Sequence, residues 1–235
     1  MTKFFSRVFT IAFTLLVSFS FIGSFALSSG KKFSFIAPIL KDSTDTIPVL
    51  SESNSIYDKL NLGIKGLSRS AFDYALSGFE KLKATGKLRR ENILTIIDFT
   101  KPSNQKRLFV IDVASLKLLF NSYVAHGQNS GKEMAESFSN NNESYQSSLG
   151  FYVTADTYAG KNGYSMHLNG VEKGFNDHAY ARAIVMHGAD YATENFVQAN
   201  GYLGRSWGCP ALPLNLVFEI LPVISDGCLV YAYFE

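Results

Sequence analysis

The sequence predicts a mainly β domain with a few helices over residues 91–235, preceded by a short helical segment at 55–90. Short runs rich in β-branched and aromatic residues recur after residue 91, and such runs favour strands. Turn-forming residues separate these runs, as at 101–104 and 160–163, which suits a chain that reverses often. The runs expected to form strands are 93–99, 108–112, 118–125, 151–157, 164–168, 183–187 and 229–234.

The helical segment shows a different pattern. Between residues 55 and 88 apolar residues recur at spacings of three and four, which indicates an amphipathic helix. Ser68 or Ser70 is placed to cap its start, and Gly86 to end it. A second helix is expected after residue 209, ending at Pro222. Its apolar stripe comprises Leu214, Val217, Phe218 and Leu221.

The first residues indicate export. A short basic region precedes an uncharged run at 8–27, and the small residues at 24–26 suit a signal peptidase. We therefore expect a signal peptide at 1–26 and a periplasmic or other extracytoplasmic location. The run is also long enough to span a bilayer, so membrane attachment through an uncleaved N-terminal segment is the alternative.

The charge balance bears on the partners of the protein. Removing residues 1–26 takes away Lys3 and Arg7 but no acidic residue, which leaves 20 basic and 20 acidic residues. Phosphate binding needs clustered excess positive charge, so we expect no nucleic-acid partner. Residues 27–54 are rich in Ser, Thr, Lys and Asp and are expected to form a flexible tether.

One histidine and one cysteine are candidate catalytic residues. His187 ends an apolar run and precedes Gly188, where the backbone can turn sharply. Cys209 lies 22 positions further on, in a turn flanked by glycine and proline. The two side chains can meet only through folding.

Thiol chemistry explains why this combination is informative. A neighbouring imidazole can hold a thiolate as an ion pair and later return the proton to a leaving amine. Gly208 and the backbone after it are expected to donate N–H groups to the oxyanion, and Ser206 to hydrogen-bond within the site. If the second helix begins just beyond Cys209, its N-terminal dipole lowers the pKa of the thiol further. The polar segment 129–148 is long enough to be functional rather than a mere connection.

Two other uses of these residue types compete with catalysis. Cys228 opens an apolar run and is expected to be a buried strand residue, but a disulfide with Cys209 would consume the nucleophile. A zinc site built from the histidines is a second rival. No HExxH motif or short Cys/His spacing supports it, so neither a metal nor an organic cofactor is expected.

Residues 187–213 resemble the active-site segment of the L,D-transpeptidases, the YkuD-type fold. That family carries His-Gly, a spacer and Ser-x-Gly-Cys, and this chain has His-Gly at 187–188 and Ser-Trp-Gly-Cys at 206–209. The resemblance covers about residues 105–235 and is closest to a murein L,D-transpeptidase branch. It implies a β-sandwich or barrel-like catalytic domain at 91–235. Its further matches lie at 126–131, 147–150, 164–170 and Arg182.

The resemblance also implies a reaction on peptidoglycan stem peptides. Cys209 would attack the carbonyl at the L-centre of the third residue, with His187 as its base. The terminal D-amino acid would leave and a thioester would form. An amine from another stem would then give a crosslink, whereas water would make the enzyme an L,D-carboxypeptidase.

The sequence departs from the commoner family motif around Cys209. Trp207 stands where many members have a second histidine, and Pro210-Ala211 replaces an aliphatic residue and an arginine. No Lys or Arg follows Cys209 at all, so the group that holds the substrate carboxylate is open. The candidate substrate-binding residues are Arg205, Arg182, His126, Trp207 and His167, each with a structural role as the alternative.

Two other functions remain as alternatives. Papain-like enzymes and cell-wall amidases place the cysteine before the histidine, and sortases need an arginine after the cysteine, so both fit poorly. A catalytically inactive envelope-binding module of the same fold is favoured by Trp207 and by the missing arginine.

Overall fold

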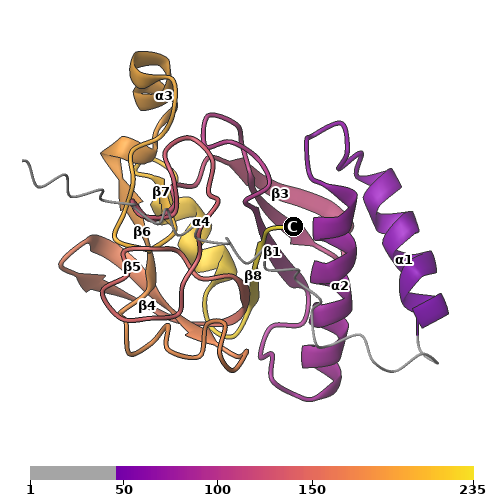
Figure 1. The fold of residues 1–235 in the computed structure, drawn as a ribbon. Coiled ribbons are helices and arrows are strands. Elements are labelled where there is room, and N and C mark those ends of the chain that lie inside the picture. The colour runs from indigo at the N-terminus through magenta and orange to yellow at the C-terminus, as the bar shows by residue number, and fades with distance from the viewer. Residues whose placement is uncertain (1–45) are drawn as a thin grey trace, which may run out of the picture. The chain divides into compact units, whose positions relative to one another are not determined.

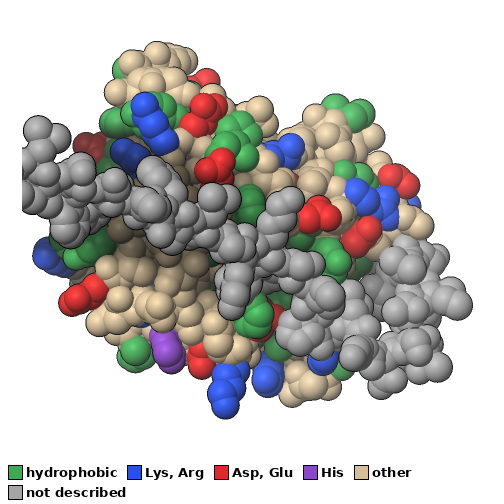
Figure 2. All heavy atoms as spheres, viewed as in Figure 1, with side chains coloured by type: hydrophobic (Ala, Val, Ile, Leu, Met, Phe, Trp, Pro, Cys, Tyr) green, Lys and Arg blue, Asp and Glu red, His purple; other side chains and the backbone are tan. Residues whose placement is uncertain are grey.

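The computed structural model describes residues 46–235, with side chains from Ser53 onward. The expected signal peptide at 1–26 lies outside the described residues, as does the part of the expected tether at 27–45. None of the helices within 46–235 combines the length and hydropathy needed to cross a bilayer. On the face shown in Figure 2, Lys and Arg side chains are interspersed with Asp and Glu side chains.

Eight strands form one strongly curved, nearly closed, barrel-like sheet in the order β3-β2-β1-β8-β4-β5-β6-β7 (Figure 1). Two pairs, β1 with β8 and β6 with β7, are parallel, and the others are antiparallel. The expected mainly β fold is confirmed. The strands are β1 (Ile93–Asp98), β2 (Leu108–Asp112), β3 (Lys117–Ser122), β4 (Gly150–Gly160), β5 (Gly163–Gly170), β6 (Val185–Ala189), β7 (Ala211–Pro213) and β8 (Leu229–Tyr233).

Within residues 46–235, four α-helices and one 3-10 turn accompany the sheet. They are α1 (Thr46–Lys59), α2 (Arg69–Ala84), η1 (Asp190–Ala192), α3 (Glu194–Asn200) and α4 (Val217–Ile224). Helix α1 begins inside the range expected to be a tether. Helix α4 continues through Pro222 rather than ending there. The proline lies within the last turn, where its missing N–H removes only one intrahelical hydrogen bond.

The ends of α2 follow the capping expectation. The Ser68 side chain accepts a hydrogen bond from the backbone nitrogen of Ala71 at 3.2 Å, as an N-cap residue does. Gly86 follows the helix with a φ of +66°, in the left-handed region that glycine adopts without strain. The sequence signals at both ends are therefore confirmed.

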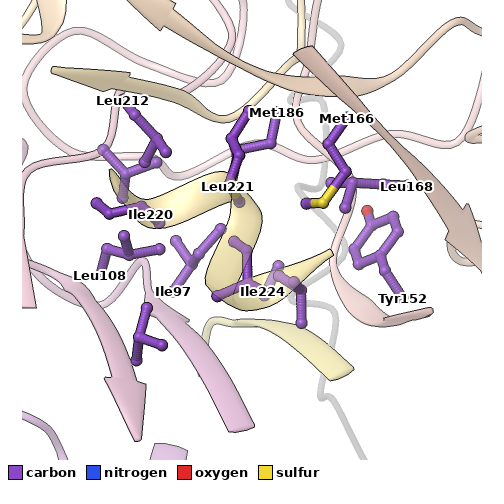
Figure 3. Packing of buried hydrophobic residues seen from close by; sticks show 14 of the residues in the cluster. Ile97, Leu108, Tyr152, Met166, Leu168, Met186, Leu212, Ile220, Leu221 and Ile224 are labelled. Carbon is purple, nitrogen blue, oxygen red and sulfur yellow. The ribbon is translucent and has the colours of Figure 1, made fainter. Parts of the chain in front are cut away.

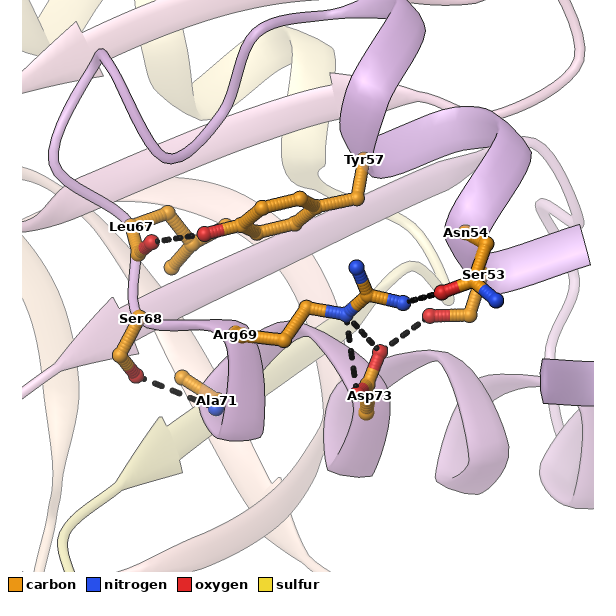
Figure 4. A network of polar contacts seen from close by, with 8 residues as sticks. All are labelled: Ser53, Asn54, Tyr57, Leu67, Ser68, Arg69, Ala71 and Asp73. Carbon is orange, nitrogen blue, oxygen red and sulfur yellow. Dashed lines mark hydrogen bonds and ion pairs between the residues drawn. The ribbon is translucent and has the colours of Figure 1, made fainter.

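Polar contacts join the end of α1 to the start of α2 (Figure 4). The Arg69 guanidinium donates to both carboxylate oxygens of Asp73, at 2.9 and 3.0 Å, and also to the Asn54 side chain. The Tyr57 hydroxyl donates to the Leu67 carbonyl at 2.7 Å. These contacts fix the turn between the two helices.

The sheet separates two hydrophobic cores. Helix α2 packs on one face of β1 and β8, where Phe72, Phe79 and Phe151 are buried. Helix α4 packs on the other face, against β1, β4, β5 and β6. Figure 3 shows Ile220, Leu221 and Ile224 of α4 among the side chains of these strands.

Burial on both faces explains the composition of the central strands. Every residue of β1 and of β8 is buried. A strand covered on both faces reads as a continuous apolar run rather than an alternating one. Only Thr95 and Asp98 interrupt β1 with polar groups, and the Asp98 carboxylate accepts the backbone N–H of Ser68 at 2.9 Å. The central strands of the sheet can therefore be recognised in the sequence as apolar runs.

We predict that Gly78→Ala destabilises the protein. A Cβ at this buried position would lie 2.1 Å from the Phe151 ring, and the clash is expected to cost about 1–3 kcal/mol. This cost exceeds the gain of about 1 kcal/mol from alanine in a helix. Urea unfolding measures the difference. Ser77→Ala, one position earlier on α2, is the control and should be neutral or slightly stabilising. A Gly78→Ala variant as stable as the parent would contradict the packing.

Candidate active site

The parallel pairing of β6 and β7 brings Cys209 beside the strand that carries His187. His187 pairs in register with Ala211, two residues after Cys209. The backbone nitrogen of His187 donates to the Pro210 carbonyl at 3.4 Å. The separation of 22 positions in the sequence is therefore closed by one strand pair at the edge of the sheet.

The sulfur of Cys209 occupies the next hydrogen-bonding position along β6. N–H groups of alternate residues point to the same edge of a strand, so Val185 directs its N–H toward β7 as His187 does. The Val185 nitrogen lies 3.4 Å from the Cys209 sulfur. The thiol in turn lies 3.8 Å from the carbonyl oxygen of Ala183. Ala183 has a φ of +53°, a conformation that costs a non-glycine residue energy and that directs its carbonyl to the sulfur.

His187 is 7% exposed, and its side chain lies in the middle of β6 rather than at its end. Its Nδ1 lies 3.0 Å from the carbonyl oxygen of Gly188. That contact makes Nδ1 the protonated nitrogen and leaves Nε2 as the acceptor. Gly188 does not make the expected sharp turn. A Cβ there would lie 2.9 Å from Val217 and 3.0 Å from Leu214. Glycine is therefore required because this position packs against α4 and the segment that precedes it.

Within residues 46–235, no hydrogen bond joins the Cys209 sulfur to the His187 ring, and both groups favour their neutral forms. Burial raises the pKa of the Cys209 thiol, although the Val185 N–H and the Arg182 charge partly offset it. Burial lowers the pKa of His187, and its bond to the Gly188 carbonyl partly offsets this. The resting pair is therefore thiol and neutral imidazole, not the ion pair expected from the sequence.

Ser206 and Gly208 shape the turn before the cysteine. The Ser206 hydroxyl accepts from the Gly208 backbone nitrogen at 3.1 Å and donates to the Cys209 carbonyl at 2.6 Å. Gly208 has a φ of +118°, and a Cβ there would lie 2.7 Å from the Gln146 carbonyl oxygen. The Gly208 N–H is thus already bonded. In the described part of the chain, the N–H of Cys209 itself has no protein acceptor.

Arg182 clamps the polar segment 129–148 against this turn. Its guanidinium donates to the Ser139 carbonyl at 2.7 Å, the Gln146 carbonyl at 2.8 Å and the Ser144 hydroxyl at 3.1 Å. It also donates to the Ser148 hydroxyl. The same guanidinium lies 3.4 Å from where a Gly208 Cβ would be. Its hydrogen-bonding capacity is largely taken by the loop, while its charge acts on the thiol.

Arg205 and Trp207 lie on either side of Ser206 and are both exposed. The Arg205 guanidinium makes one long contact, 3.4 Å, with the Gly131 carbonyl. Trp207 is 70% exposed, and its ring meets the edge of the Tyr145 ring, with centroids 5.6 Å apart. Both side chains remain available to a ligand beside Cys209.

His126 lies in the interior, fully buried. The buried Arg107 donates to its Nδ1 at 2.7 Å, and its Nε2 lies 3.2 Å from the Gly131 carbonyl. Burial, followed by the Arg107 charge, lowers the pKa of His126 to about 3. Burial lowers the pKa of Arg107 itself to about 9. Both ring nitrogens of this histidine are engaged with protein groups, so the structure gives it a loop-anchoring position.

His167 lies on β5 directly across from Val185. Its ring stacks on Tyr158, with centroids 4.7 Å apart, and lies 5.3 Å from the Tyr180 ring. Its Nδ1 is buried without a hydrogen-bond partner. The histidine is therefore between two tyrosines on β5, which pairs with the edge of β6 opposite to the one that binds the sulfur.

Tyr191 is a neighbour of the thiol that sequence reasoning missed. It follows β6 in η1, and the Gly204 nitrogen donates to its carbonyl at 2.9 Å. Burial raises its pKa to about 12, and the Cys209 and Asp190 charges add to that effect. A tyrosine four positions after a histidine carries no motif, so only the folded chain identifies it.

Two expectations about Cys209 can be compared with the structure. Cys209 and Cys228 are both free thiols. The residues after Cys209 form β7, and the next helix begins only at Val217. The expected helix dipole at the thiol is therefore wrong, because the chain first pairs with β6 and with Ala125.

Within residues 46–235, no group of three or more His, Cys, Asp and Glu side chains could hold a metal ion.

The model of the L,D-transpeptidase catalytic domain family matches residues 64–233, and the chain belongs to this family. The match begins within the turn that precedes α2, and it includes every strand of the sheet. No curated protein matches the sequence.

Solved structures similar to this chain share little sequence identity with it. An L,D-transpeptidase from Mycobacterium smegmatis is 12% identical, with a TM-score of 0.38, over 61% of this chain and 59% of that one. The helical cell shape determining protein Pgp2 from Campylobacter jejuni, a K307A mutant, is 12% identical, with a TM-score of 0.41, over 68% and 54%. The chain thus spans between half and two thirds of the length of these structures.

We predict that Arg182→Gln slows alkylation of Cys209. Removing a positive charge near the sulfur destabilises the thiolate, so the pKa of the thiol rises and the rate with iodoacetamide at pH 8 should fall about threefold or more. Mass spectrometry of the Cys209 peptide measures the rate. In Arg182→Lys, which keeps the charge, the alkylation rate should fall less. In Arg205→Gln the rate should equal that of the parent. Equal rates in Arg182→Gln and the parent would refute the electrostatic role.

We predict that His126 makes the protein acid-sensitive. Its pKa of about 3 in the folded state lies below the ordinary imidazole value, so between about pH 6.5 and 3 the unfolded chain binds one more proton there. Stability is therefore lost as the pH falls, by about 1.4 kcal/mol per pH unit from this group. His126→Gln should remove that much of the slope of the unfolding free energy between pH 6 and 4. An unchanged slope would show that the buried Arg107–His126 contact is not maintained.

Proposed function

We propose that the protein is a cysteine-dependent acyltransferase that acts on peptidoglycan stem peptides through a thioester on Cys209. The observation that carries the proposal is the position of the Cys209 sulfur, which lies 3.4 Å from the Val185 nitrogen. Val185 is two residues before His187 on the same strand, β6. The free thiol thereby bonds to the strand that carries the imidazole, whose Nε2 is unprotonated. Family membership supports the choice of substrate.

The first half-reaction uses the neutral pair. The sulfur leaves its contacts with Val185 and Ala183, and His187 Nε2 takes the thiol proton as the sulfur attacks the carbonyl carbon. Catalytic hydrogen bonds are often long in the absence of substrate and tighten only in the complex. The Cys209 N–H stabilises the oxyanion. The C–N bond then breaks, and His187 returns the proton to the nitrogen of the departing D-amino acid.

The second half-reaction resolves the thioester. His187 accepts a proton from an incoming amine, the new C–N bond forms, and the proton passes to the Cys209 sulfur as it leaves. An amine from a second stem gives a crosslink, which is the transpeptidase reaction, and water gives the carboxypeptidase reaction. No step requires a metal or an organic cofactor.

Substrate binding falls to the exposed residues around the turn. Arg205 is the cation best placed to receive a substrate carboxylate, because it is exposed and makes one long hydrogen bond. Arg182 acts through its charge on the thiol and by holding the loop. His126 anchors the loop from the interior. Trp207 is exposed two residues before Cys209, and His167 lies on β5 across from Val185.

We propose that the protein acts outside the cytoplasm, where peptidoglycan lies. The expected signal peptide at 1–26 would deliver it, or would anchor it if uncleaved.

A catalytically inactive envelope-binding module is the second candidate. The observation in its favour is that the sulfur bonds to the backbone of Val185 and Ala183 rather than to the His187 ring. The lack of a basic residue after Cys209 points the same way.

We predict that Cys209→Ser and His187→Ala each reduce turnover of a disaccharide-tetrapeptide muropeptide about a thousandfold or more. The reason is that one variant removes the nucleophile and the other its base. Mass spectrometry of the products measures turnover and separates crosslinked from trimmed stems. The parent should also gain the mass of a carbapenem on Cys209, because a β-lactam carbonyl acylates the same thiol.

The controls distinguish the two candidate functions. Cys228→Ala removes the other thiol, and labelling and turnover should remain. Both active-site variants should keep the unfolding midpoint of the parent within a few degrees. Full activity in Cys209→Ser would eliminate the thioester, and a parent that binds muropeptide without labelling or turnover would be the inactive module.

A further inference from the structure

Two aromatic side chains form an exposed pair next to the nucleophile. Trp207 is 70% exposed and Tyr145 is 36% exposed, and their rings meet at 64° with centroids 5.6 Å apart. Trp207 is the sole tryptophan of the chain. Large apolar side chains that lie together in water lower solubility, and such patches often serve as binding sites.

The backbone that carries Trp207 is fixed on both sides. The Ser206 nitrogen donates to the His126 carbonyl at 2.9 Å, and the Gln128 nitrogen donates to the Ser206 carbonyl at 2.8 Å. On the other side, the Gly208 carbonyl accepts from the buried Ser147 hydroxyl at 3.2 Å. The indole therefore projects from a rigid turn.

The backbone at Tyr145 is held in a conformation that is energetically unfavourable for a tyrosine. Tyr145 has a φ of +53°, a left-handed conformation that a bulky residue adopts only where its surroundings impose it. Its carbonyl accepts from the Asn129 nitrogen at 3.1 Å, and the Gln146 side chain donates to the Asn129 carbonyl at 3.0 Å. The strained residue directs its ring to Trp207. A pair held in place before binding loses little entropy when a ligand arrives.

We propose that Trp207 and Tyr145 form a carbohydrate subsite for an N-acetylated amino sugar of the glycan strand that bears the stem peptide. This proposal rests on the proposed function. The face of an aromatic ring carries partial negative charge, which suits the weakly positive C–H groups on one face of a sugar ring. Exposed side chains near the pair include the uncharged Gln128 and Asn129, whose amides suit hydroxyl and acetamido groups. Arg205, on the other side of Ser206, is also exposed and is the residue that the proposed function assigns to a substrate carboxylate.

The distances along both chains agree with this assignment. The attacked carbonyl belongs to the third stem residue, so the sugar-bearing end of an extended stem lies about 10 Å away. Trp207 is two residues from Cys209, so their Cα atoms are at most about 7.6 Å apart. With the length of an indole side chain added, its exposed ring can reach a sugar at that distance while the carbonyl is at the sulfur.

The test uses tryptophan fluorescence, which reports on Trp207 alone. The full chain carrying Cys209→Ala is titrated with a β-1,4-linked tetramer of N-acetylglucosamine and, separately, with the tetrapeptide without sugar. We expect the tetramer to shift or quench the emission. Tyr145→Asn, which removes the ring and tolerates the left-handed backbone, should weaken tetramer binding about fivefold or more. Tyr180→Ala, at a different exposed aromatic residue, should leave it unchanged.

Each result decides the proposal. No response to the tetramer would overturn it, and so would a response that Tyr145→Asn does not weaken. A response to the tetrapeptide alone would make the pair a stem-peptide subsite instead. Emission that changes with protein concentration, without ligand, would show that the pair is covered by a second copy of the chain, and this too would overturn the proposal. Because binding is measured without the nucleophile, a failure here is distinguishable from failure of the parent to turn over muropeptide.

Discussion

The hydrogen-bonding edge of β6 that faces β7 is the interaction on which the site depends. Val185 and His187 both direct their N–H groups out of this edge, and the His187 nitrogen donates to the Pro210 carbonyl. The Val185 nitrogen donates to the Cys209 sulfur instead of to a carbonyl oxygen. A buried N–H without a partner is costly, so the thiol completes the sheet as well as serving as the candidate nucleophile. The same N–H favours the thiolate over the thiol, because a hydrogen bond to a charged acceptor is the stronger one.

Burial and charge act in opposite directions on this sulfur. Burial favours the neutral thiol, whereas Arg182 and the Val185 N–H favour the thiolate. Arg182 can remain charged while half buried because four groups of the loop accept its hydrogen bonds, among them the carbonyls of Ser139 and Gln146. The loop thus stabilises the arginine, and the arginine fixes the loop beside the cysteine. A substitution in the loop or at Arg182 therefore changes the pKa of the thiol.

The sequence indicates those features that arise from local patterns. The fully buried β1 and β8 read as apolar runs, and the cap at Ser68 has its own signature. Strand β7 was missed because it has three residues, ends in proline and exists only through pairing with β6. The turn expected at Gly188 and the helix dipole expected at Cys209 failed for the same reason: the neighbour that decides the local conformation is distant in sequence. The assignment of His187 and Cys209 rests on their residue types and stays a prediction, whereas the burial of His126 against Arg107 and the proximity of Tyr191 carry no sequence signal.

The missing arginine after the cysteine has a structural explanation. Ala211, the position at which many relatives carry it, is fully buried, and its nitrogen and oxygen both bond to Ala125, at 3.3 and 2.8 Å. A long charged side chain at this position would have to leave water without a partner, which is costly. Under the proposed function, the cation that meets a substrate carboxylate would therefore come from the exposed side of the turn, where Arg205 lies. The strand pairing that presents the sulfur thus also determines from which side the substrate can be held.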